Sequence, residues 1–186
     1  MPNYHIYITS SLPYLQFGLK APISFERFLE LCRNLLSPEE FSFLKISKNI
    51  IEEDIKHYSK ISDTAIIWQN FEFMLRNELV KIRAKRLHRN ALSYLRGHLE
   101  TEPSLAHKIS EIVRQPHPLE AERMLDMVRW NKLEELCFGH YFDIEFLFIY
   151  AQKLLLLERW DKIHSADKQE LLNNTLNAIE NVTVNR

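Results

Sequence analysis

Residues 143–160, DIEFLFIYAQKLLLLERW, decide the fold class of this 186-residue chain. Between positions 144 and 157 this stretch is apolar nearly all round, and only Glu145, Gln152 and Lys153 interrupt it. A helix that is apolar on every side is buried inside a protein, whereas a membrane span needs ~20 predominantly apolar residues. The stretch therefore predicts a core helix that Asp143 caps and that continues to about Trp160.

Helical signals surround this stretch on both sides. Ser24 can cap a helix, and Ser37-Pro38-Glu39-Glu40 is a capping box with proline at the first helical position. Pro118 and Gly139 bracket a further helix. The predicted helices are 24–36, one starting at 37, 63–89, 104–114, 119–138, 143–160 and one starting at 165 or 167, with a less clear short helix at 50–58. The sequence predicts an all-α fold, with six or seven helices in an irregular bundle.

Two features of the organisation stay open from the sequence. Residues 4–9 alternate weakly, which is compatible with one short N-terminal β element or with a short helix that ends near Pro13. Residues 1–186 fit a single helical domain. Gly97 and the prolines at 103, 116 and 118 make residues 90–118 a hinge candidate between two helical halves.

Several classes of chemistry are excluded by pattern. The chain has three glycines, Gly18, Gly97 and Gly139, so it contains no G-x-G-x-x-G or G-x-x-x-x-G-K-[ST] phosphate loop. Cys32 and Cys137 form no C-x-x-C pair, and we expect two reduced, buried thiols. The eight histidines include no H-E-x-x-H pattern. We therefore predict no catalytic residue, no cofactor, no metal and no small-molecule substrate; Trp130 is expected in the core.

The charge distribution gives one candidate site. The net charge is −1, yet residues 81–96 contain six basic residues, His88, and no acidic residue. We call residues 81–96 the basic strip; its predicted partner-binding residues are Lys81, Arg83, Lys85, Arg86 and Arg89. The alternative is that these cations only offset the dipole at a helix C-terminus or form a solvated face. Because Tyr94 is the one aromatic residue in the strip, binding of single-stranded nucleic acid is disfavoured.

Several short patterns resemble an uncharacterised bacterial family whose members are encoded beside the genes of V/A-type ATPases. The resemblance covers residues 4 to about 175 and rests on patterns of leucine, arginine and tryptophan. The patterns are Tyr4, Ser11-Leu12-Pro13-Tyr14-Leu15, Phe17-Gly18, Pro22-Ile23-Ser24-Phe25, Phe28-Leu29, Cys32, Leu75-Arg76-Asn77-Glu78, Arg83-Ala84-Lys85, Ala121-Glu122-Arg123, Arg129-Trp130, Phe142-Asp143, Tyr150, Lys153-Leu154 and Glu158-Arg159-Trp160.

The resemblance implies a shortened relative of the ATPase socket protein (the C-type component, called d-type in vacuolar enzymes), which joins the central stalk to the membrane ring. We therefore expect a non-catalytic subunit or accessory protein of a proton- or sodium-translocating V/A-type ATPase. Its expected partners are the stalk and membrane-ring subunits. We expect a cytoplasmic protein, held at the inner membrane through partners and without direct membrane insertion. The alternative function is a helical adaptor that binds nucleic acid or an acidic protein surface through residues 81–96.

Overall fold

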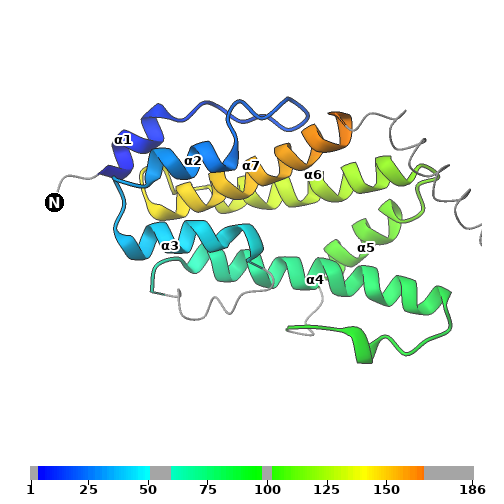
Figure 1. Cartoon of the computed structure of the whole chain (residues 1–186). Helices are drawn as coiled ribbons and strands as arrows, with labels where there is room; N and C mark the ends of the chain where they lie inside the picture. The colour runs from blue at the N-terminus through cyan, green and yellow to red at the C-terminus, as the bar shows by residue number, and fades with distance from the viewer. Residues whose placement is uncertain (1–3, 51–59, 98–101, 166–186) are drawn as a thin grey trace, which may run out of the picture.

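The computed structural model describes residues 4–50, 60–97 and 102–165, and within these ranges it is all-α, as predicted (Figure 1). No strand occurs in the described residues, so the N-terminal alternation at residues 4–9 forms a helix and not a β element. The α-helices are α1 (Tyr4–Ser11), α2 (Phe25–Cys32), α3 (Pro38–Ile46), α4 (Asp63–Arg86), α5 (Pro103–Ile112), α6 (Pro118–Leu136) and α7 (Ile144–Ser165), with short 3-10 turns η1 (Ser47–Asn49) and η3 (Leu92–Tyr94).

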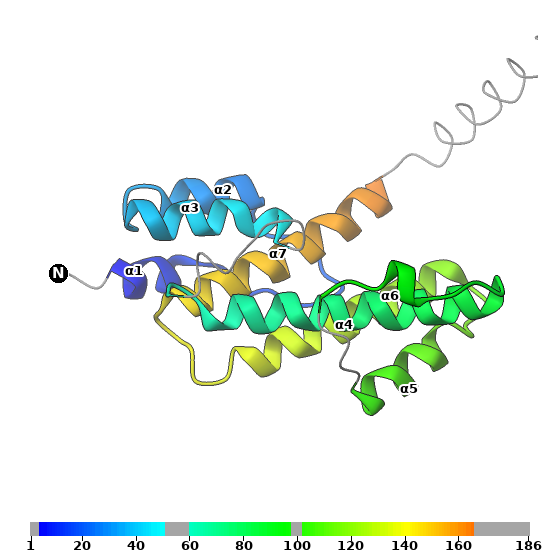
Figure 2. The same ribbon diagram turned by 90° about the horizontal axis from the view of Figure 1, so that it is seen from below.

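Helix α7 lies at the centre of the bundle. It packs against α1, α2, α3, α4 and α6, and Figure 2 shows it crossing between the α2–α3 pair and the long helices α4 and α6. Ten of its residues are buried, among them Leu147, Phe148 and Leu154 with no exposed surface. Because apolar side chains leave α7 in every direction, the helix needs neighbours on all sides, and the expected core helix is confirmed.

The predicted helix starts are confirmed by their capping contacts. The Ser24 hydroxyl accepts a hydrogen bond from the Arg27 N–H at 3.1 Å. At the capping box, the Ser37 hydroxyl accepts from the Glu40 N–H at 3.3 Å, while the Glu40 carboxylate accepts from the Ser37 N–H at 3.0 Å. Asp143 Oδ1 accepts from the Phe146 N–H at 2.9 Å. These contacts are local, which is why the sequence predicts them well.

Helix ends depart from prediction by a few residues. Helix α2 stops at Cys32 and not at Leu36; after it, the Leu35 N–H donates to the Cys32 carbonyl three residues back at 3.1 Å, as in the tighter turns that end many helices. Helix α4 stops at Arg86, and α6 stops at Leu136, three residues before Gly139. The short helix predicted at 50–58 and the one predicted after Ser165 fall outside the described residues, apart from residue 50.

The loop between α1 and α2 is fixed onto α7. The Tyr150 hydroxyl donates to the Pro13 carbonyl at 2.9 Å. The Ala21 N–H donates to Asp161 at 3.0 Å and the Phe25 N–H to Glu158 at 2.7 Å. Segments more than 130 positions apart are thus joined by hydrogen bonds whose acceptors include two carboxylates.

Helix α5, which lies within residues 90–118, belongs to the main hydrophobic core. Leu105, Ile109 and Ile112 of α5 are buried in the same cluster as residues of α4 and α7. Trp130 is also buried in it, as expected, with its ring 5.5 Å from that of Phe17. Residues 98–101 of this stretch lie outside the described part, and the hinge stays a prediction.

Candidate partner-binding surface

The basic strip 81–96 consists of the last turns of α4 and the loop that follows. Arg83, Lys85 and Arg89 are exposed and form no ion pair with any residue that the structure describes. Lys81 is paired with Glu78 at 2.7 Å, and the Arg86 guanidinium donates to the Val113 carbonyl at the end of α5 at 3.3 Å. Two of the five predicted partner-binding residues thus have contacts within the protein, and three are free to bind another molecule.

Backbone groups complete the hydrogen bonding at the end of α4. The Arg89 N–H donates to the Ala84 carbonyl at 2.9 Å, and the His88 N–H donates to the Lys85 carbonyl at 3.3 Å. His88 has a φ of 51°, in the left-handed region that ends many helices. The free side chains are therefore not needed to cap these carbonyls. Their attraction to the helix dipole contributes at most ~1 kcal/mol each at an exposed site.

The loop after α4 returns along the helix and is anchored there. The Asn77 side chain is buried and makes two hydrogen bonds to the backbone of Arg96, at 2.8 and 3.0 Å. Next to it, Gly97 has a φ of +67°, and a Cβ at this position would lie 2.7 Å from the Phe73 ring. In the structure Gly97, which belongs to the predicted hinge stretch, allows a close approach of the loop to α4.

The free cations do not share one face of α4. Successive residues of an α-helix are ~100° apart, so Arg83 and Lys85 point in directions that differ by roughly 160°. Helix α5 contacts α4 through Arg86, and the anchored loop covers the side of Asn77. The cations therefore surround the exposed end of the helix, rather than forming a flat stripe.

A second charged cluster is buried between α4, α6 and α7. Asp126 has a fully buried side chain, and its carboxylate accepts hydrogen bonds from Arg129 at 2.9 Å, Arg159 at 3.0 Å and the Trp160 indole N–H at 2.9 Å. Arg129 also binds Glu72 of α4 at 2.7 Å. Arg159 reaches outward to Glu122 at 2.7 Å. The cluster links three helices through one chain of ion pairs.

The buried cluster has a structural role. Burial raises the pKa of the Asp126 carboxyl, although Arg129 and Arg159 act in the opposite direction. Burial likewise lowers the pKa of Arg129, but Glu72 and Asp126 outweigh it and raise that pKa above its usual value. In the described part of the chain, no buried side-chain nitrogen or oxygen lacks a hydrogen-bond partner. A buried polar network in which every group has a partner makes the packing of its helices specific.

Sequence patterns did not identify this cluster. The sequence pointed to Arg129 and Arg159 only through the family resemblance, and no sequence pattern pointed to Glu72 or Asp126. Helical spacing gives a usable signal, because Glu122, Asp126 and Arg129 follow one another at i, i+4 and i+7 on one face of α6. The resemblance patterns around Trp130 and Trp160 thus fall largely on residues that hold the bundle together.

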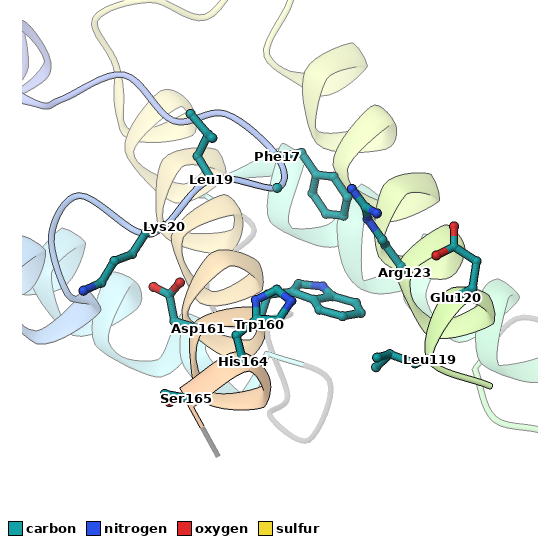
Figure 3. A pocket seen from close by; sticks show the side chains of 11 residues that line it. Phe17, Leu19, Lys20, Leu119, Glu120, Arg123, Trp160, Asp161, His164 and Ser165 are labelled. Carbon is teal, nitrogen blue, oxygen red and sulfur yellow. The ribbon is translucent and has the colours of Figure 1, made fainter. Parts of the chain in front are cut away.

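Figure 3 shows a groove of about 860 Å³ between the start of α6, the end of α7 and the α1–α2 loop. Phe17, Leu19, Leu119 and Trp160 supply its apolar surface. The charged side chains at its edge are Lys20, Glu120, Arg123 and Asp161. Asp161 is already bonded to the Ala21 N–H, whereas Lys20 and Arg123 make no ion pair with the described residues. The groove brings together Phe17, Arg123 and Trp160, which the sequence connected only by resemblance.

The remaining candidate features are metal ligands, the two cysteines and a membrane-spanning helix. In the described ranges, no group of three or more histidine, cysteine or acidic residues is arranged to hold a metal ion. Cys32 is buried, and burial raises the pKa of its thiol to about 12; Cys137 is half-buried, with a pKa that burial raises as well. Among the described helices, none combines the length and the apolar character that crossing a membrane requires.

Comparison with known proteins concerns the C-terminal part of the chain. Residues 104–183 match the model of a family described as a protein of unknown function (DUF2764). This stretch includes nearly all of α5 together with α6 and α7, and therefore Asp126, Arg129, Arg159 and Trp160 of the buried cluster. No curated protein and no solved structure shows significant similarity to the chain.

Proposed function

We propose that this protein is a non-catalytic subunit or accessory protein of a V/A-type ATPase, bound from the cytoplasmic side to stalk or membrane-ring subunits. The observation that carries the proposal is the group of free cations at the end of α4: Arg83, Lys85 and Arg89 are exposed and unpaired within the described residues. Such a group suits an acidic protein surface. The resemblance of residues 4 to about 175 to a shortened ATPase socket protein supplies the identity of the partner.

Other features support a binding role. The charged cluster around Asp126 joins α4, α6 and α7, and the loop anchored at Asn77 lies beside the cations. A rigid surface loses little conformational entropy when it binds a partner. A connecting protein needs no bound nucleotide or metal, so the function requires nothing beyond these surfaces.

Affinity capture tests this proposal directly. Tagged protein, expressed in its native cell and purified from detergent-solubilised membranes, is expected to recover ATPase stalk or ring subunits. The double variant Lys85→Glu/Arg89→Glu should lose most of this recovery, and added salt should weaken capture by the wild type, since the Debye length is already only about 8 Å at 0.15 M. Recovery of no ATPase subunit by the wild type would refute the assignment.

A second candidate function is a nucleic-acid adaptor, and the clustering of charge in residues 81–96 is the observation that favours it. For duplex DNA or RNA, the logarithm of the binding constant should then fall linearly with the logarithm of the salt concentration. The slope of this line reports the number of phosphate contacts. Binding that is specific to acidic protein, with no capture of nucleic acid at low salt, would exclude this candidate.

A further inference from the structure

The end of α4 presents an apolar side chain among its free cations. Leu87 follows the last helical residue and is 68% exposed, although leucine is usually buried. Arg83 and Lys85 lie in the preceding turn, and Arg89 comes two residues later. An isolated exposed leucine is common, but this one lies one helical turn after Arg83, within the surface already proposed to bind a partner.

We propose that the partner receives this helix end in a concave surface whose walls are acidic and whose floor is apolar, with Leu87 against the floor. The inference rests on the proposed function and specifies the chemistry of the binding partner. Carboxylates on the walls would pair with Arg83 on one side of the helix and with Lys85 on the other, and a further carboxylate would pair with Arg89 beyond the helix end.

The direction of the side chains argues for a concave partner. Arg83 and Lys85 differ by roughly 160° around the helix axis, so a flat surface can contact only one of them. A nucleic-acid groove can place phosphates on both sides of a helix, but its apolar surface is limited to small groups such as the thymine methyl, so it matches Leu87 less well than an apolar protein surface does. A recess that surrounds the helix end can satisfy both cations and remove the leucine side chain from water.

The neighbouring elements define how the partner approaches. Arg86 fixes the end of α5 beside α4, and Asn77 fixes the returning loop on another side. Access therefore remains from the end of the helix and from the two sides that carry Arg83 and Lys85. Because the contacts of Arg86 and Asn77 exist before binding, the surface is formed in advance.

Binding of purified, detergent-solubilised V/A-type ATPase to the immobilised full chain tests the inference. The variants are Arg83→Glu, Lys85→Glu and Leu87→Ala. The matched controls are Lys45→Glu, an exposed cation of α3, and Ile67→Ala, a residue 47% exposed near the start of α4. Each of the three variants should weaken binding at least about tenfold, as residues at the centre of an interface do. The controls should bind as the wild type does, and all five should unfold within a few degrees of the wild-type temperature, since an exposed charge at a helix end contributes at most ~1 kcal/mol.

Each contrary result has a distinct meaning. If only one of Arg83→Glu and Lys85→Glu weakens binding, the partner surface is not concave and the inference is wrong. If Leu87→Ala binds like Ile67→Ala, there is no apolar floor, and the inference is again wrong although the proposed function stands. If the wild type does not bind the ATPase at all, both the proposed function and this inference are refuted.

Discussion

Asp126 is a fully buried carboxylate that holds two arginines and a tryptophan in place. The variant Asp126→Asn keeps the size of the side chain but removes the negative charge, leaving Arg129 and Arg159 with one counter-charge fewer. Breaking a buried ion pair from one side costs about 3–5 kcal/mol, and we expect a loss of this size in urea unfolding.

Glu122 provides the matched control at the exposed end of the same network. The Glu122 and Arg159 side chains are 44% and 43% exposed, and an exposed pair contributes only about 0–1 kcal/mol. Glu122→Gln should therefore change the free energy of unfolding by less than about 1 kcal/mol. Equal losses for Asp126→Asn and Glu122→Gln would show that the buried charges are not the source of the stability.

Glu40 connects a helix cap to the N-terminal helix and predicts a pH dependence. Burial alone would raise the pKa of its carboxyl, but hydrogen bonds from Ser37 and the charge of His5, 3.0 Å away, lower it below its usual value. A lowered folded-state pKa stabilises the protein above the unfolded-state value of about 4.3, and this stabilisation is lost as the pH falls through the folded-state pKa.

The variant Glu40→Gln isolates that charge, because glutamine also fits a capping box. The wild type should have a higher melting temperature than the variant at pH 7, and the difference should shrink as the pH is lowered below about 4. Glu39→Gln is the control, since Glu39 is exposed and makes no ion pair with a described residue. If the difference in melting temperature between the wild type and Glu40→Gln stayed constant with pH, the Glu40 charge would not be the source of the stabilisation.

At the scale of elements, α7 packs against five other helices, but its leucines are not equivalent. Leu154 has no exposed surface, whereas Leu155 is half-buried. Leu154→Ala should cost about 2–5 kcal/mol through lost transfer energy and the cavity left behind. Leu155→Ala should cost clearly less in the same denaturant melt. Equal losses would show that the core does not centre on the side of α7 that carries Leu154.

At the scale of the whole molecule, the shared hydrophobic core allows a test of the hinge predicted at 90–118. Helix α5 lies within that stretch, yet its Leu105, Ile109 and Ile112 are buried with residues of α4 and α7. Because this shared core links both halves, we expect one cooperative transition on heating. Circular dichroism and tryptophan fluorescence should give coincident curves. Separate transitions for the two probes would favour two helical halves that unfold independently.

The sequence alone determined the all-α class, the central position of α7 and the starts of α2, α3, α4 and α7. These features depend on neighbours within a few positions: a cap such as Ser37 reaches the N–H three residues ahead, and the apolar run of α7 has no polar side to expose. It also located the cations of residues 81–96, because like charges within one segment need no tertiary information.

Only the tertiary structure decided that Arg86 is not free, because it binds the Val113 carbonyl, 27 positions away. The Lys81–Glu78 pair is instead local, three positions apart on one helix. The burial of Asp126 depends on Arg159 and Trp160, more than 30 positions later in another helix. Pairing and burial are settled by packing between distant segments, since the same acidic or basic residue is stable either solvated at the surface or buried with a partner.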